Sequence, residues 1–170
     1  MCTSLLSRLF RKGKKLPPIS MGYNNGEDFI DLGLSVRWGI RNIGADISEQ
    51  AGSYYNYDEI EGKYNLPTSD EVRELFEKCV IRYDKKKGGF SVKGPNGNML
   101  FFPVGGERGG NAHYEGSYFW TCSDYEEGYM EGYKYYGGIY VVNKVLKTVK
   151  KELNLLKRDG FWINVREVQR

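Results

Sequence analysis

The alternation of apolar and polar positions is clearest over residues 68–79, where apolar side chains recur with the period of an α-helix. These positions have the spacing i, i+3, i+4 and i+7 and are occupied by Val72, Leu75, Phe76 and Cys79. Thr68 and Glu71 have the spacing of a capping box, in which each side chain accepts a backbone N–H at the helix start. The pattern predicts a structural helix over 69–79.

Shorter segments alternate with a period of two, which is typical of half-buried strands. Residues 36–43 predict a strand whose Trp38 faces the core. Two apolar runs, 90–92 and 99–102, flank the sequence Gly94-Pro95-Asn96-Gly97-Asn98. Because Asn-Gly between apolar runs favours a tight turn, this stretch predicts a β-hairpin.

The second half of the chain is less clearly patterned. Residues 104–138 interleave glycine with tyrosine, and only 118–120 predict a strand, so the remainder is expected to form long loops. A strand is expected near 139–142. Beyond it, 143–157 is either an insertion of uncertain structure or a helix, because its apolar residues fit a helical stripe. A terminal strand is predicted at 161–168.

Charge divides the chain into two parts. The formal net charge is +3, but residues 1–15 contain five basic residues and no acid, so the rest carries −2. Pro17-Pro18 separates this basic arm from the remainder of the chain. We therefore expect a basic arm at 1–26, either a tether to a membrane or an assembly or a frayed terminus, and one domain at 27–170. Nucleic-acid binding by the folded domain is not expected.

Candidate reactive groups are sparse. The three cysteines, Cys2, Cys79 and Cys122, have no disulfide or zinc spacing and are expected to be buried free thiols. His113 is the single histidine, and pairing it with Cys122 gives only a weak hydrolase hypothesis. An acidic loop over 124–131 is interpreted as solvated rather than as a calcium site. We predict no catalytic residue, no metal and no cofactor.

Several motifs occur in a fixed order along the chain. They are Asp31-Leu32-Gly33-Leu34-Ser35-Val36-Arg37-Trp38 with Asn42-Ile43-Gly44-Ala45, residues 66–79, the Gly94–Asn98 turn, residues 118–123, and 160–166. Over residues 29–168 this order resembles a domain family widespread in Bacteroidota, the major paralogous domain first catalogued in Fibrobacter succinogenes. The chain departs from the family pattern at 54–59, which lacks the usual Trp-Gly, and at 143–158, which is longer and more basic.

The resemblance implies an α+β, C-type-lectin-like fold: a twisted antiparallel sheet with one or two helices and long loops. Formylglycine-generating enzymes share this fold, but their paired C-terminal cysteines have no counterpart after Cys122. In such folds the long loops between the late strands form the ligand face. Tyrosine supplies amphipathic contact area in binding loops, and glycine lets the loops change shape.

We therefore predict a non-catalytic module that binds a protein or a glycan through its Gly/Tyr-rich loops at 105–136. The candidate ligand-binding residues are Arg108, His113, Tyr114, Tyr125, Tyr129 and Tyr133. A structural or receptor-binding component of a larger assembly, such as a bacteriophage particle, is the alternative. A homo-oligomer is compatible with either hypothesis. No signal peptide or apolar span is recognisable, which favours a cytoplasmic or virion-associated location.

Overall fold

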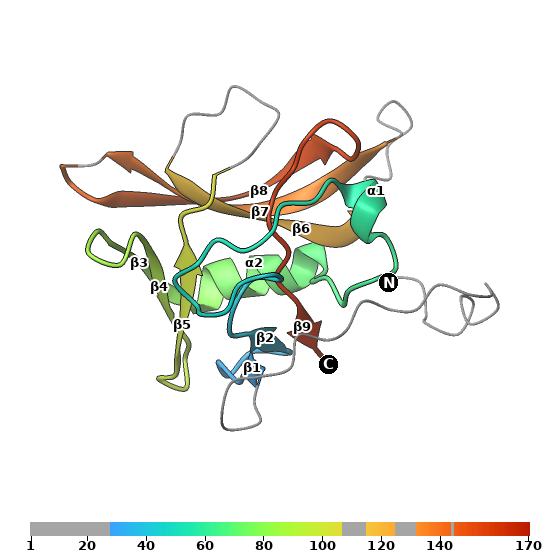
Figure 1. Cartoon of the computed structure of the whole chain (residues 1–170). Helices are drawn as coiled ribbons and strands as arrows, with labels where there is room; N and C mark the ends of the chain where they lie inside the picture. Colours follow the sequence, from blue (N-terminus) through green and yellow to red (C-terminus); the bar gives the residue numbers. More distant parts are fainter. Residues whose placement is uncertain (1–27, 107–114, 125–131, 144) are drawn as a thin grey trace.

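The computed structural model describes residues 28–106, 115–124, 132–143 and 145–170. Within these ranges the chain forms two helices and three antiparallel three-stranded sheets, which confirms a small α+β domain (Figure 1). The elements are β1 (Phe29–Ile30), β2 (Arg37–Gly39), α1 (Tyr57–Ile60), α2 (Ser69–Lys78), β3 (Val80–Asp84), β4 (Gly89–Lys93), β5 (Met99–Pro103), β6 (Gly116–Asp124), β7 (Tyr133–Asn143), β8 (Thr148–Lys157) and β9 (Val168–Gln169). No described helix has the length and apolar character of a membrane-spanning segment.

Helix α2 begins and ends close to where the sequence predicts. The Thr68 side chain accepts the Glu71 amide at 3.1 Å, and the Glu71 carboxylate accepts the Thr68 amide at 2.8 Å. Both bonds satisfy amides that the first helical turn leaves without partners. Cys79 forms the C-terminal cap, and the helix buries the predicted apolar face against the β6–β7–β8 sheet.

The β3–β4–β5 sheet contains the predicted hairpin and one strand that the pattern did not indicate. Strands β4 and β5 pair from Gly89↔Pro103 to Lys93↔Met99, which confirms the hairpin. Strand β3 pairs with β4 directly after helix α2. Its residues are exposed or half-buried throughout, so β3 lacks the buried alternation that identifies a strand in a sequence.

The β6–β7–β8 sheet corrects the prediction for the second half of the chain. Strand β7 holds tyrosines expected in loops, and β8 pairs with β7 from Tyr133↔Lys157 to Asn143↔Thr148. The competing helix over 143–157 is therefore wrong, and the strand expected near 139–142 is confirmed. The glycines of β7 have a packing role, because a Cβ at Gly137 would lie 2.5 Å from Cζ of Phe119.

The β1–β2–β9 sheet is formed by the two ends of the domain. The strand predicted over 36–43 is shorter than expected, since β2 covers three residues, but Trp38 is fully buried as predicted. The strand predicted over 161–168 is also shorter than expected, because the strand observed there, β9, begins only at Val168. Before β9, Ile163 forms an antiparallel bridge to Tyr55, and Asn164 a parallel bridge to Phe119.

Helix α1 lies between β2 and α2 and is not among the elements predicted from the sequence. It is a single turn of four residues, too short to show a helical apolar stripe. Its start is nevertheless capped, because Asn56 and Glu59 form reciprocal side-chain bonds to each other's amides. The local capping signal therefore exists in the sequence, at the spacing that also marks α2.

Two hydrophobic cores lie on opposite faces of the β6–β7–β8 sheet. Side chains alternate across a strand, so Phe119 and Ile139 pack into the core that contains α2. Tyr118, Trp120 and Tyr136 belong to the second core, which includes residues of α1 and of the C-terminal segment. This sheet is therefore covered on both faces, which explains its long run of buried positions.

A buried arginine connects the sheets at the centre of the domain. Arg166 is fully buried, and its guanidinium donates to Asn42 Oδ1 (2.8 Å), the Gly39 carbonyl (2.9 Å) and the Phe101 carbonyl (3.2 Å). Its Cζ lies 4.4 Å from the ring centroid of Phe102. Burial lowers the pKa of Arg166 to about 9, so the side chain is still a cation at neutral pH.

The packing of Gly137 gives a test of the corrected strand β7. Replacing Gly137 with alanine places a methyl group against the Phe119 ring, and we expect a loss of about 1–3 kcal/mol in the free energy of unfolding. Gly160→Ala is the matched control, because its nearest neighbours lie at ordinary contact distances of 3.8 and 3.9 Å. Urea unfolding measures both, and equal midpoints for the two variants would contradict the packing.

Candidate functional site

The structure describes one of the six predicted ligand-binding residues. Arg108, His113, Tyr114, Tyr125 and Tyr129 lie outside the described residues. Tyr133 is the first residue of β7, is half-buried and is paired with Lys157 of β8. What the structure defines is therefore the support from which the two Gly/Tyr-rich segments, 107–114 and 125–131, leave the sheet.

Backbone hydrogen bonds, here called the Gly105–Gly106 clasp, join the two stretches of chain that flank the first segment. The amides of Gly105 and Gly106 both donate to the carbonyl of Gly116, at 3.0 and 2.9 Å. The Tyr54 hydroxyl donates to the Gly105 carbonyl at 2.5 Å. A Cβ at Gly105 would lie 2.5 Å from Asn164 Oδ1, so glycine is required at this point. The chain is fixed immediately before the segment begins.

An ion pair joins the two strands, β6 and β7, that flank the second segment. Asp124, the last residue of β6, is paired with Lys134 of β7 both in backbone register and through their side chains. The Arg158 amide donates to the Gly132 carbonyl at 2.8 Å. Lys134 Nζ also lies 4.4 Å from the ring centroid of Tyr57. The nearly buried lysine thus has both a carboxylate and an aromatic partner, as a buried cation requires.

Strand β6 separates the two attachment points. One segment joins the strand at Gly116 and the other at Asp124, at opposite ends (Figure 1). At ~3.3 Å per residue, nine residues of strand place these ends about 26 Å apart. The residues from Gly116 to Thr121 are all buried, so the strand between the segments is held from both faces.

A tyrosine–carboxylate network lies on the face of this sheet opposite α2. The hydroxyls of Tyr136 and Tyr140 donate to the two oxygens of Glu152, at 2.7 and 3.0 Å. The ring of Tyr118 packs against both tyrosines, with centroids 5.9 and 6.3 Å apart. Burial, together with Glu152, raises the pKa of Tyr140 against the opposing effect of Lys150.

The sequence did not single out this network. Its members come from all three strands of the sheet, and Gly138 is the residue opposite both Tyr118 and Glu152. Only the strand register brings them together. A usable signal existed in the even-numbered positions 136 and 140, which share one face of any strand through this stretch.

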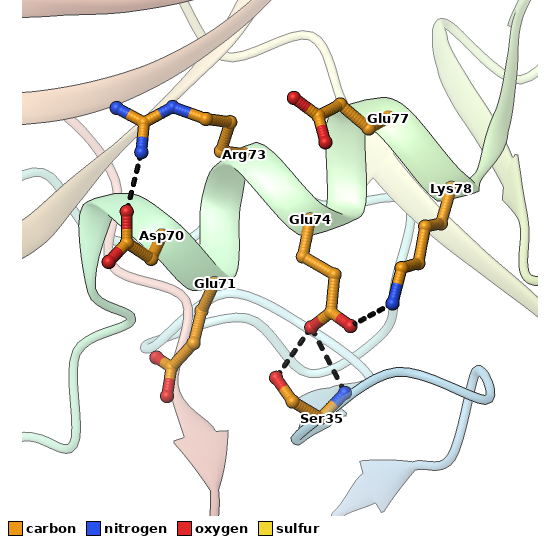
Figure 2. A pocket seen from close by; sticks show the side chains of 7 residues that line it. All are labelled: Ser35, Asp70, Glu71, Arg73, Glu74, Glu77 and Lys78. Atoms are coloured by element: carbon orange, nitrogen blue, oxygen red, sulfur yellow. Dashed lines mark hydrogen bonds and ion pairs between the residues drawn. The ribbon is translucent and has the colours of Figure 1, made fainter.

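A pocket of about 390 Å³ lies along the exposed side of α2 (Figure 2). Its lining residues are Ser35, Asp70, Glu71, Arg73, Glu74, Glu77 and Lys78. Glu74 accepts the Ser35 amide at 3.0 Å, the Ser35 hydroxyl at 2.5 Å and Lys78 Nζ at 2.7 Å. These bonds tie the helix to the loop before β2, so Glu74 serves the fold at this position.

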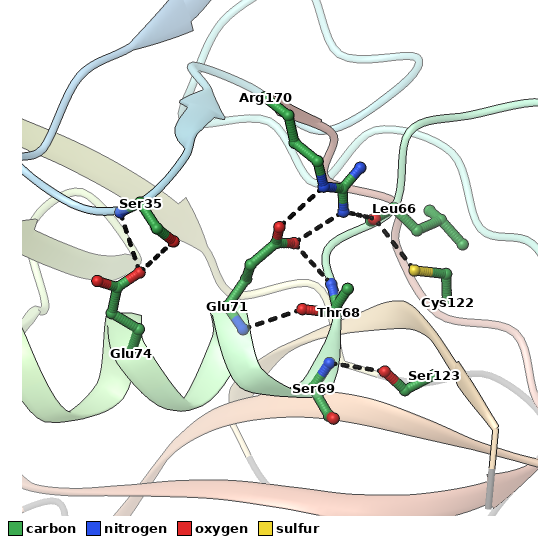
Figure 3. A network of polar contacts seen from close by, with 9 residues as sticks. All are labelled: Ser35, Leu66, Thr68, Ser69, Glu71, Glu74, Cys122, Ser123 and Arg170. Carbon is green, nitrogen blue, oxygen red and sulfur yellow. Dashed lines mark hydrogen bonds and ion pairs between the residues drawn. The ribbon is translucent and has the colours of Figure 1, made fainter. Parts of the chain in front are cut away.

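A second polar network holds the start of α2 (Figure 3). Arg170 donates through Nε and Nη2 to the two oxygens of Glu71, both at 2.9 Å, and to the Leu66 carbonyl at 3.1 Å. The Ser69 amide donates to the Ser123 hydroxyl at 2.8 Å. The final residue of the domain and the end of β6 are thereby joined to the first turn of α2.

The two described cysteines differ from each other. Cys79 is a buried free thiol, as predicted, and burial with a contribution from Glu74 raises its pKa to about 11. Cys122 is disulfide-bonded, so the expectation of a free thiol there is wrong. A disulfide sulfur is not the thiolate that a cysteine nucleophile requires. The histidine of the hydrolase hypothesis, His113, lies outside the described residues.

Candidate metal ligands do not gather in the described part of the chain, where no cluster holds three or more His, Cys, Asp or Glu side chains. Of the acidic loop considered as a calcium site, only Asp124 is described, and it is paired with Lys134. A comparison of the chain with protein-family models, curated proteins and solved structures gives no significant match.

The environment of Glu74 predicts how stability responds to acid. Burial raises its pKa, but the bonds from Lys78 and Ser35 outweigh that effect, and the net pKa is lowered. A carboxyl group with a lowered folded-state pKa stabilises the fold above its unfolded pKa, and this contribution is lost as the pH falls through the folded pKa. Glu74→Gln should therefore lower the free energy of unfolding at pH 7. On acidification the variant should lose less of its free energy of unfolding than the wild type does.

Urea unfolding at pH 7 and at about pH 3.5 measures this difference. Glu77→Gln is the matched control, because it removes an exposed carboxylate from the same helix. We expect the gap between wild type and Glu74→Gln to narrow at the lower pH. A gap of the same size at both pH values would show that Glu74 does not contribute through its charge.

Proposed function

We propose that this chain is a non-catalytic binding module, with a C-type-lectin-like arrangement, that recognises a protein or a glycan. The ligand surface is formed by the Gly/Tyr-rich segments that leave the two ends of β6. The order of motifs that resembles the Bacteroidota domain family supports the same proposal. Three antiparallel sheets around a single main helix are compatible with that fold.

One observation supports this function above others: both segments are attached to β6, in which the residues from Gly116 to Thr121 are all buried. Binding residues are commonly carried by loops on a rigid support, because a rigid support loses little conformational entropy when the ligand binds. The Gly105–Gly106 clasp and the Asp124–Lys134 pair fix the support at the point where each segment begins.

The residue types of the two segments suit recognition. Tyrosine combines a large ring with a hydroxyl and loses little side-chain entropy when it is ordered. The first segment carries Arg108, His113 and Tyr114, and the second carries Tyr125 and Tyr129, with Tyr133 at the start of β7. Aromatic rings with a few polar groups match either a sugar face or a protein surface.

The distance between the attachment points distinguishes a protein ligand from a small sugar. The two attachment points, about 26 Å apart, fit within a typical protein interface of ~800 Å² per partner, whereas a small sugar covers only one end. A protein ligand should therefore need both segments. A mono- or disaccharide should need one of them.

Two variants test the proposal. One replaces Arg108, His113 and Tyr114 with alanine, and the other replaces Tyr125, Tyr129 and Tyr133 with alanine. We expect at least one variant to lose binding by about tenfold or more, as removal of interface aromatic and arginine side chains does. The measurements are binding to a defined glycan array and to surface proteins captured by the wild-type chain.

The control is Ile47→Ala, which removes an exposed apolar side chain outside both segments. Thermal unfolding should show that all three variants remain folded. Loss in one variant alone favours a small glycan, and loss in both favours a protein. Undiminished binding in both variants would refute the proposed surface.

A further inference from the structure

The β7–β8 hairpin extends beyond the rest of its sheet. Pairing between β6 and β7 stops at Gly116↔Tyr140, whereas pairing between β7 and β8 continues to Asn143↔Thr148 (Figure 1). The last residues of this hairpin therefore form a two-stranded projection. Val141 at the base of the projection is buried in the core that contains α2, whereas Val142, Val145 and Leu146 are exposed and available for contact with another surface.

The tip of this projection exposes aliphatic side chains. Val145 is 90% exposed, Leu146 is 75% exposed and Val142 is 50% exposed. Hydrogen bonds hold the described part of the turn, because Asn143 Oδ1 accepts the amides of Val145 and Leu146 at 3.0 and 2.9 Å. Tight turns favour Asn, Gly and Asp, so turn geometry does not call for Val and Leu at the apex.

Positive charge surrounds the aliphatic tip. Residues 142–151 contain four lysines and no acid. Among the described ones, Lys147 and Lys150 are exposed, although Lys150 Nζ also lies 4.0 Å from Glu152 Oε2, and Lys151 donates to the Phe76 carbonyl. Ile47 lacks this setting, because it is 52% exposed but has Asp46 and Glu49 as neighbours in the sequence.

The β3–β4 turn adds charge at the same end of the molecule. It contains Lys85, Lys86 and Lys87, all exposed. Two contacts place this turn near the projection: the Tyr83 hydroxyl lies 3.4 Å from Glu115 Oε2, and the Val141 amide donates to the Glu115 carbonyl at 3.2 Å. The two turns therefore extend from neighbouring strand ends and form a lysine-rich surface, in which Lys87 is also paired with Glu49.

We propose that this surface docks the protein on an anionic lipid bilayer, with Val145 and Leu146 inserted into the interface. Aliphatic side chains enter the boundary between headgroups and acyl chains, and the surrounding lysines remain at the level of the negative headgroups. Each lysine near such a surface strengthens binding by about fivefold. A single-stranded nucleic acid would favour aromatic rings for stacking on bases, and the described tip has none.

Vesicle sedimentation of the full chain tests the proposal. The probes are vesicles of phosphatidylcholine alone and of phosphatidylcholine with about 30% phosphatidylglycerol, an anionic content chosen to give a clearly negative surface potential. We expect binding to the anionic vesicles only, weakened by salt. The double variant Val145→Ser, Leu146→Ser should bind at least about tenfold more weakly, because the aliphatic contribution is lost.

A second variant, Lys147→Gln with Lys150→Gln, should weaken binding and reduce its salt dependence. Ile47→Ser is the matched control for removing an exposed aliphatic side chain and should bind like wild type. A further chain carries glutamine at the five basic positions of residues 1–15, to separate the arm from the hairpin. Equal thermal midpoints for all variants show that folding is unchanged.

A direct measurement of insertion uses Leu146→Trp. Phospholipid brominated near the glycerol end of its acyl chains should quench this added tryptophan more strongly than the native ones. Three outcomes would overturn the proposal: anionic-vesicle binding that survives the tip substitutions, binding lost only in the arm variant, or no vesicle binding at all. Tip-dependent self-association, or tip-dependent binding to an acidic protein or to DNA, without vesicle binding would overturn it as well.

Discussion

The buried guanidinium of Arg166 is the interaction on which the architecture depends. A charge removed from water is tolerated only where hydrogen bonds replace its hydration, and the partners of Arg166 come from two other regions of the chain. The end of β2 with the segment after it, and strand β5, must both be in place around the C-terminal segment to supply them. Asn42 extends the network, because its amide also donates to the Ala51 carbonyl at 2.8 Å.

This network explains why the fold could be predicted further than the function. Asn42 and Arg166 lie in two of the motifs that resemble the Bacteroidota family, and Thr68 and Glu71 lie in a third. In the structure Asn42, Glu71 and Arg166 bind distant parts of the chain, and Thr68 caps helix α2. Motifs of this kind record the requirements of folding, whereas the proposed ligand contacts lie in the segments between them.

The accuracy of each sequence prediction depends on the range of the interaction behind it. Helix α2 and the β4–β5 hairpin depend on signals within a few residues, namely a capping box and an Asn-Gly turn, and both were predicted correctly. Strand β7 was expected to be largely loop because glycine is frequent in it. In the structure its glycines make room for the rings of Phe119 and Tyr118 from β6, which the sequence alone does not reveal. The pairing of Glu152 with Tyr136 and Tyr140 depends on register and could not be predicted from composition.

The placement of the two Gly/Tyr-rich segments at opposite ends of one buried strand has a consequence for how this domain can change. Sites separated by more than ~10 Å and sharing no partners generally have additive effects on free energy. Substitutions or insertions in one segment therefore leave the other undisturbed. Under the proposed function, such a scaffold can acquire a new specificity at one end while preserving an old one at the other, which makes it suitable for combinatorial diversification.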